Sequence, residues 1–301
     1  MDSWPVTVAL PMVLALIMFG LGLALTMDDF TRVVRYPRAV IVALSCQLVA
    51  LPALAFGLVV AVGLAPELAV GVMLLMASPG GATANLLSHL FRGDVALNVT
   101  LTAVNSVLAV VTLPLVTNLA LGYFAPPGAD GIGLQFGKVA QVFALVLIPI
   151  TAGMATRRLR PGFADRMDRP VRMISVGFLA VVTLAALAAE RDSVLDYLAA
   201  VGLVVALLCV ASLGIGYFVP KAFGVARTQA IACSMEVGIH NSTLAMTVAI
   251  SVLGDIRMAV PAGVYGIVML PIAFLAGTAI SRRIRRDEAA EPVAATSAAR
   301  E

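Results

Sequence analysis

The 301-residue chain is 61% apolar and 12% charged, with a net charge of +3 and a mean hydropathy of +1.02. Soluble domains carry about twice this share of charged residues, so the composition excludes an ordinary soluble protein. Apolar runs of roughly 20 residues recur along the whole chain. We therefore expect an all-α polytopic membrane protein in contact with the lipid bilayer. Its basic residues mark topology and do not indicate a nucleic-acid partner.

Nine apolar segments of helix length follow one another without a long polar linker. They cover roughly residues 6–27, 37–62, 66–90, 95–123, 136–156, 172–189, 196–219, 226–254 and 260–281. The first has no preceding basic residue and no small-residue cleavage site, which predicts a retained span and not a signal peptide. The three cysteines fall inside predicted spans without paired or metal-ligand spacing. We expect them to be small buried apolar residues.

Basic residues gather in alternate connections between these spans. Sixteen of the 20 follow the odd-numbered spans: Arg32, Arg35, Arg38, Arg92, Arg157, Arg158, Arg160, Arg166, Arg169, Arg172, Lys221, Arg227, Arg282, Arg283, Arg285 and Arg286. The opposite connections hold only Lys138, Arg191 and Arg257, and Arg300 lies in the tail. By the positive-inside rule, a multi-pass protein of the plasma (inner) membrane is predicted, with its N-terminus outside and its C-terminus in the cytoplasm.

The third span contains a strong helix breaker. In "SPGGATAN", Pro79 lacks a backbone donor and clashes with the preceding turn, and Gly80 and Gly81 leave the freed carbonyls unshielded. The eighth span has a weaker breaker, Gly238, within "EVGIHNS". At bilayer depth such an interruption is tolerated where it is buried in protein or lines a cavity. A simple kink is the alternative interpretation.

The two interrupted spans also show a faint internal similarity. Setting Asn85 against Asn241 sets Ser78 against Ser234. The spans are five apart and so cross the membrane in opposite directions. Interrupted helices in matching places of two oppositely oriented halves are typical of inverted-repeat secondary transporters, although two matched residues can also arise by chance.

A carboxylate lies in the middle of the eighth span, in "MEVGIHNSTLAM". An ionisable group at this depth costs a few kcal/mol or more, which favours a functional role for Glu236 over a merely structural one. Four polar side chains share one face of the fourth span: Asp94, Asn98, Thr102 and Asn105. Such groups can bond a neighbouring helix or coordinate a cation. Hard oxygen ligands and a single negative charge favour sodium or a proton over zinc or copper.

Two stretches, "ASPGGATANLLSHLFRGDVALNVTLTAVNS" and "EVGIHNSTLA", resemble the crossover signatures of the bile acid:sodium symporter family. The N-terminal "IMFGLGLALTMDDF" and "YPRAVIVALSCQLVALPALAF" resemble its opening helices, so the similarity runs from about residue 10 to residue 281. The resemblance implies nine transmembrane helices, inverted repeats and two broken helices that cross beside bound sodium. It implies one transporter domain at 1–286, with panel helices at about 6–62 and 136–189 and core helices at about 66–123 and 196–281. The polar tail 287–301 is predicted to be disordered.

The resemblance also implies a set of site residues. The first sodium site would comprise Asn85, Asn98, Thr102 and Glu236, with Asn98 where the family often has serine. The second would comprise Gln47, Glu236 and the carbonyls of Val237 and Ile239, beside His240. Substrate would contact Ala82, Thr83 and Asn241, and the helix-breaking residues would be Pro79, Gly80, Gly81 and Gly238.

His240 stands where many relatives have glutamine, which puts the second sodium site in doubt because an imidazole nitrogen is a poor sodium ligand. The implied function is sodium-coupled symport, by alternating access, of a small organic anion such as a bile-acid-like, steroid-sulfate or pantoate-like carboxylate. Na⁺ would be the coupling ion, with no organic cofactor. Proton coupling through Glu236 and His240 and a passive channel or uniporter are the alternatives. No catalytic triad or dyad converges, so an enzyme is not expected.

The charge bias yields a direct test of orientation. Cysteines placed at Ala125 and Arg160 should react with an impermeant thiol reagent from opposite sides of the membrane, with position 125 labelled from outside. Labelling of position 160 from outside would overturn the predicted orientation.

Overall fold

The computed structural model describes residues 22–125, 136–167 and 194–298, with shorter pieces at 12, 15–16, 18–20, 170–171, 173–174 and 177. Within these ranges the regular elements are helices joined by short turns, together with one isolated β-bridge. The elements are α2 (Met27–Thr31), η1 (Arg32–Val34), α3 (Pro37–Ser45), η2 (Cys46–Ala50), α4 (Leu51–Val62), α5 (Pro66–Ala77), α6 (Ala82–Leu90), α7 (Val95–Phe124), α8 (Phe136–Leu159), α10 (Val194–Ala222), α11 (Arg227–Gly238), α12 (Ser242–Val248), η3 (Ala249–Leu253), η4 (Arg257–Ala259) and α13 (Val260–Ala298).

Four described segments are long and apolar enough to cross a membrane. They are Pro37–Val62, Val95–Phe124, Val201–Ala222 and Arg257–Ile280. Each carries large apolar side chains that are exposed on its outer face, such as Leu119, Leu203 and Leu275. Apolar surface of this extent suits lipid and not water, so the chain is an all-α, multi-pass membrane protein. The spans expected at 6–27 and 172–189 lie largely outside the described residues.

The centre of the bundle is formed by α5 and α11, which are buried on every side. All residues from Glu67 to Ala77 are buried in α5, as are Ala230–Gly238 in α11. A helix that is apolar all round belongs inside a bundle. Small residues permit close approach: a Cβ on Gly71 would overlap the backbone of Met258, and one on Gly216 would lie 2.8 Å from Ser234 Cα.

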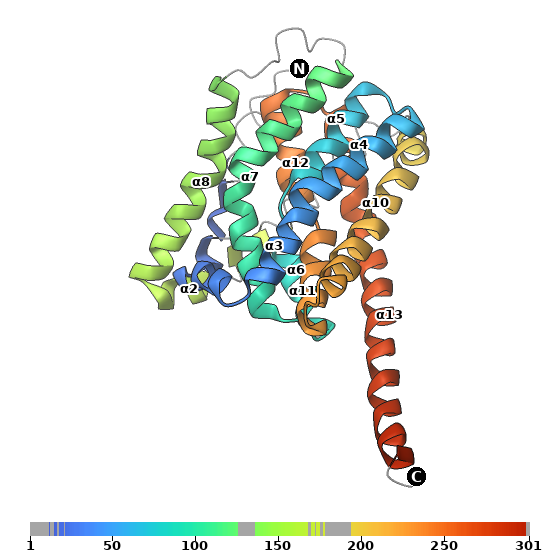
Figure 1. Ribbon diagram of the computed structural model, residues 1–301. Helices are drawn as coiled ribbons and strands as arrows, with labels where there is room; N and C mark the ends of the chain where they lie inside the picture. The colour runs from blue at the N-terminus through green and yellow to red at the C-terminus, as the bar shows by residue number, and fades with distance from the viewer. Residues whose placement is uncertain are drawn as a thin grey trace.

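Each central helix is continued by a second half-helix after a short interruption. In Figure 1, α5 lies in the upper part of the bundle and α6 in the lower part, whereas α11 is low and α12 is high. The two segments therefore run through the bundle in opposite directions. The ends of α6, α8 and α10, which lead into basic connections, lie at the lower end in the same view.

The packing of 37–62 differs from the expected panel assignment. The α3–η2–α4 segment packs against α5, α10, α11 and α7, all of which were expected in the core. The expectation came from the family resemblance, and burial of α5 and α11 requires covering helices on all sides. These contacts favour grouping 37–62 with the core helices.

The internal repeat also has a different register from the one that Asn85 and Asn241 suggested. Asn241 precedes α12 as its N-cap, whereas Asn85 lies inside α6. The breaks coincide instead when "GLAPE" (63–67) is set on "GVART" (224–228), and this register also sets "GDV" (93–95) on "GDI" (254–256). Gly63 and Gly224, which precede the two broken helices, both have left-handed φ angles, of 67° and 74°.

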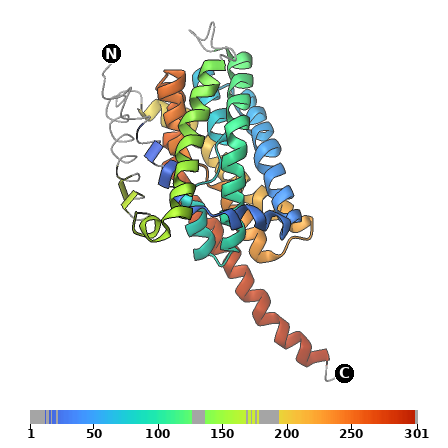
Figure 2. The same cartoon turned by 90° about the vertical axis from the view of Figure 1, so that its left-hand side faces the viewer.

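The C-terminal segment is helical where disorder was expected. Helix α13 continues from Val260 to Ala298, so residues 287–298 extend it beyond the bundle (Figure 2). Five of the twelve residues of "DEAAEPVAATSA" are alanine, a strong helix former, although Pro292, which disfavours a helix, also lies in this segment.

Candidate functional site

The two interruptions contact each other at the centre of the bundle. Gly80 and His240 form an antiparallel β-bridge, and the backbone N–H of Asn241 donates to the carbonyl of Pro79 at 2.9 Å. The C-terminal ends of α5 and α11 and the N-terminal ends of α6 and α12 therefore meet in one place. We call residues 78–81 and 239–241, with the four helix ends that flank them, the crossing.

Local chemistry explains where the helices stop. Helix α5 ends at Ala77 before Pro79, which lacks a donor, and Ser78 is extended at φ −73° and ψ 142°. A side chain on Gly80 would overlap the carboxylate of Glu236, and a Cβ on Gly238 would overlap Leu213. These two glycines therefore allow the backbone to approach groups that any larger residue would displace.

Glu236 is a buried carboxylate at the crossing, with a residue exposure of 2%. Its Oε2 accepts a hydrogen bond from the Thr102 hydroxyl of α7 at 2.5 Å, whereas no described residue donates to its Oε1 with hydrogen-bond geometry. Glu236 also lies in the last turn of α11, where the helix dipole disfavours an anion and favours a cation. The position therefore favours binding of a positive charge.

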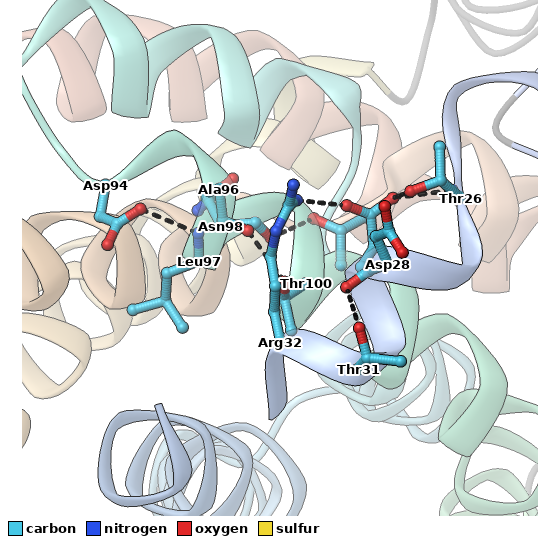
Figure 3. Close-up of polar contacts among 11 residues, drawn as sticks. Thr26, Asp28, Thr31, Arg32, Asp94, Ala96, Leu97, Asn98 and Thr100 are labelled. Atoms are coloured by element: carbon cyan, nitrogen blue, oxygen red, sulfur yellow. Dashed lines mark hydrogen bonds and ion pairs between the residues drawn. The ribbon is translucent and has the colours of Figure 1, made fainter. Parts of the chain in front are cut away.

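Helix α7 supplies further oxygen atoms from a firmly capped N-terminus. Asp94 Oδ1 accepts from the Leu97 N–H at 3.0 Å, and the Asp94 N–H donates to the Thr228 carbonyl at the start of α11, at 2.9 Å. One turn further, Asn98 Nδ2 donates to the Ala232 carbonyl of α11 at 2.7 Å. Figure 3 shows this end of α7, with Asp94, Leu97 and Asn98 labelled and Arg32, the first residue of η1, nearby.

The first predicted sodium site is thus partly assembled by direct contacts. Thr102 bonds Glu236, and Asn98 is tied to α11 four residues before Glu236. Asn85 lies on α6, which packs against both α7 and α11, and no hydrogen bond joins it to these partners among the described residues. The side-chain oxygens Asn85 Oδ1, Asn98 Oδ1 and Glu236 Oε1 are buried without a protein donor. Acceptor oxygens without donors are what a hard monovalent cation requires.

The residues of the second predicted site converge on the Ser78 carbonyl. Gln47 Nε2 lies 3.1 Å and His240 Nδ1 lies 3.2 Å from that oxygen. A carbonyl can only accept, so this contact makes Nδ1 the protonated ring nitrogen and leaves Nε2 as an acceptor. Gln47 occupies a π-helical turn that precedes Pro52, a distortion that often accompanies functional residues. The predicted site thus contains an imidazole in addition to oxygen atoms that could bind a cation.

The other predicted site residues lie at the helix ends that flank the two interruptions. Val237 packs with α3 in the last turn of α11, and Ile239 lies in the extended segment that follows. Ala82 begins α6, and Thr83 follows it and is half-buried. The Oδ1 of Asn241 accepts from the Leu244 N–H at 3.0 Å, so this oxygen caps α12 and is already engaged.

Two participants in the crossing were not found from the sequence. The Tyr265 hydroxyl of α13 donates to the Gly238 carbonyl at 2.7 Å, and the Ser78 carbonyl accepts at the second site. A lone tyrosine in an apolar span signals only that its hydroxyl needs a partner. A backbone carbonyl leaves no sequence signal beyond its place before the Pro79 breaker.

The chain is similar in sequence to several known transport proteins. The chain is 30% identical over 268 residues to a probable chloroplastic sodium/metabolite cotransporter of rice (Oryza sativa subsp. japonica), covering 88% of this chain and 62% of that protein. It is 29% identical over 280 residues to an uncharacterized sodium-dependent transporter of Bacillus subtilis, covering 92% and 84%. An ileal sodium/bile acid cotransporter of Cricetulus griseus is 25% identical over 244 residues, covering 79% of this chain and 68% of the relative.

These relatives are all named for sodium-dependent transport, and the chain spans about three fifths of the length of the rice protein. The family model of the sodium bile acid symporters matches residues 11–197, more than half of the chain, including the first broken helix of the crossing. The chain therefore belongs to the sodium bile acid symporter family.

Proposed function

We propose that the protein is a sodium-coupled symporter of a small organic anion that works by alternating access. One observation carries the proposal: a buried carboxylate, Glu236, lies at the meeting point of two broken helices and keeps one oxygen to which no described residue donates. Asn98 and Asn85 hold further oxygens without donors. One negative charge among neutral oxygens suits one monovalent cation, and the names of the relatives favour sodium.

Proton coupling is the second candidate, and the Thr102 hydroxyl favours it. That hydroxyl lies 2.5 Å from Glu236 Oε2 and 3.1 Å from the Asn98 carbonyl oxygen. When the carboxylate is ionised, both oxygens can only accept, and the hydroxyl has a single hydrogen to donate. A proton on Glu236 would donate to Thr102 and leave the Thr102 hydrogen for Asn98. We propose that this protonated form occupies the site when sodium is absent.

The substrate is proposed to be an organic anion that reaches the crossing at the beginnings of α6 and α12. Residues at these helix starts, including Gly81, Thr83 and Asn241, are half-buried, whereas the neighbouring Ser78–Gly80 segment is buried. Helix starts present free amides and a positive dipole end. Thr83, the amide of Ala82 and the remaining polar atoms of Asn241 are the proposed contacts. We also propose that the protein lies in the plasma membrane with its N-terminus outside.

Substitution of Glu236 should separate ion binding from folding. Glu236→Gln keeps the shape of the side chain and removes the charge that balances sodium. We expect normal membrane insertion but loss of the rise in melting temperature that NaCl produces over choline chloride in the wild type. Glu67→Gln, which removes another buried carboxylate at the start of α5, is the matched control and should keep the sodium effect. An unchanged sodium effect in Glu236→Gln would rule out this site.

The charge of the substrate can be tested by a thermal-shift screen of the purified protein with and without sodium. Carboxylates and sulfates should raise the melting temperature more than neutral or cationic analogues of equal size, and more strongly when sodium is present, because each co-substrate stabilises the bound form. Equal stabilisation by all three classes would contradict an anion site.

His240 should limit the number of coupled sodium ions. Its Nδ1 faces the Ser78 carbonyl and lies 3.4 Å from Gln47 Nε2. The second predicted site is therefore lined by nitrogen as well as oxygen atoms. We expect sodium activation of uptake with a Hill coefficient of about one, and a higher value for His240→Gln, which restores an amide oxygen, within the ceiling set by the number of sites. A wild-type coefficient near that of His240→Gln would show that the imidazole does not obstruct the site.

A further inference from the structure

Helix α13 packs against α11 and α12, and two of its adjacent residues contact them on either side of the break. The Tyr265 hydroxyl donates to the carbonyl of Gly238, the last residue of α11. A Cβ on the next residue, Gly266, would lie 3.6 Å from Cβ and Oγ of Ser242, the first residue of α12. Helix α13 therefore contacts both half-helices of the second broken span, one on each side of the break.

The Gly238 carbonyl is one of the orphan acceptors at the end of α11. The last backbone bond that closes this helix runs from the Ile239 N–H to the Met235 carbonyl, and the Asn241 N–H turns away to Pro79. Carbonyls in the last turn of a helix lack intrahelical donors and carry its negative dipole end. This is the turn that also holds Glu236, so a donor here offsets repulsion between the carboxylate and the carbonyls.

Tyr265 is held firmly enough to fix that carbonyl. It is fully buried, with 0% exposure, and its ring meets the His240 ring edge-on at a centroid separation of 5.5 Å and an interplanar angle of 64°. The same side chain therefore touches the last residue of α11 and the imidazole two residues further on. Both of these groups flank the predicted cation ligands at Val237 and Ile239.

We propose that Tyr265 is a positioning residue of the cation site: its hydroxyl engages the Gly238 carbonyl and fixes the last turn of α11, so that Glu236 and the neighbouring carbonyls are held for sodium. This inference rests on the proposed sodium-coupled function. It assigns the ninth predicted span a role in ion binding that depends on one hydroxyl group. The phenol itself does not contact the cation.

The test is sodium affinity, which a purely structural role would not change. In purified protein, the apparent Kd for sodium is measured from the melting temperature as NaCl replaces choline chloride. Tyr265→Phe keeps the ring and removes only the hydroxyl, and its Kd for sodium should rise about threefold to tenfold, in line with the loss of one buried hydrogen bond. Tyr217→Phe, at another buried tyrosine on α10, should stay within about twofold of the wild type.

The outcomes separate this inference from the function on which it rests. A Tyr265→Phe protein that melts at a lower temperature but binds sodium with the wild-type Kd would overturn the positioning role alone. A wild-type protein that sodium does not stabilise would overturn the proposed function and the inference together. If Tyr265→Phe is too unstable in detergent, protection from proteolysis by sodium in isolated membranes provides the same Kd comparison.

Discussion

A helix interrupted at bilayer depth must find partners inside the protein for every backbone group that the break releases. The crossing meets this constraint by making each break depend on the other. The Pro79 carbonyl accepts from Asn241, and the Ser78 carbonyl faces both Gln47 and His240. Neither broken helix could straighten without leaving groups of the other unpaired, so the two breaks persist as a pair.

The two broken helices are interrupted at matching positions but differ in charge. In the register set by Gly63 and Gly224, the counterpart of Glu236 is Leu75, and the counterparts of Asn98 and Thr102 are Ala259 and Gly263. A carboxylate buried at the crossing costs several kcal/mol, and of these two equivalent positions only that of Glu236 carries one. Two similar scaffolds therefore yield a single acidic site, with the second broken helix providing the charge and α7 of the first half providing its neutral partners.

Local chemistry could be read from the sequence, whereas contacts between distant helices could not. Proline and two glycines suffice to place an interruption between Ala77 and Ala82, and apolar run length suffices for a helical membrane protein. The hydroxyl bond of Tyr265 to Gly238 spans 27 residues, and nothing in an apolar span marks which carbonyl a tyrosine will meet. The contacts of 37–62 with α5 and α11 were likewise not visible in the sequence, because a run of apolar residues does not report which helices it will cover.

The starts of the two central helices are held by different contacts. At one end, Arg257 pairs with Glu67 at 2.8 Å and with Asp255 at 3.0 Å, but it is about half exposed, and such pairs contribute about 1 kcal/mol or less. The equivalent positions at the other end are Thr228 and Ala96, which cannot form an ion pair, and a backbone bond from Asp94 to Thr228 joins the helices there.

The starts of α5 and α11 are both closely packed. Gly71 of α5 lies against Met258, and at the other end of the bundle a Cβ on Gly93 would lie 2.5 Å from Ser88 Oγ and 3.0 Å from Ile231 of α11. Tightly packed contacts of this kind do not deform gradually. Since both starts are packed in this way and the breaks share hydrogen bonds, the crossing and the starts of its helices form one tightly packed unit. Under the proposed function, a displacement between this unit and the remaining helices would leave the immediate surroundings of Glu236 unchanged.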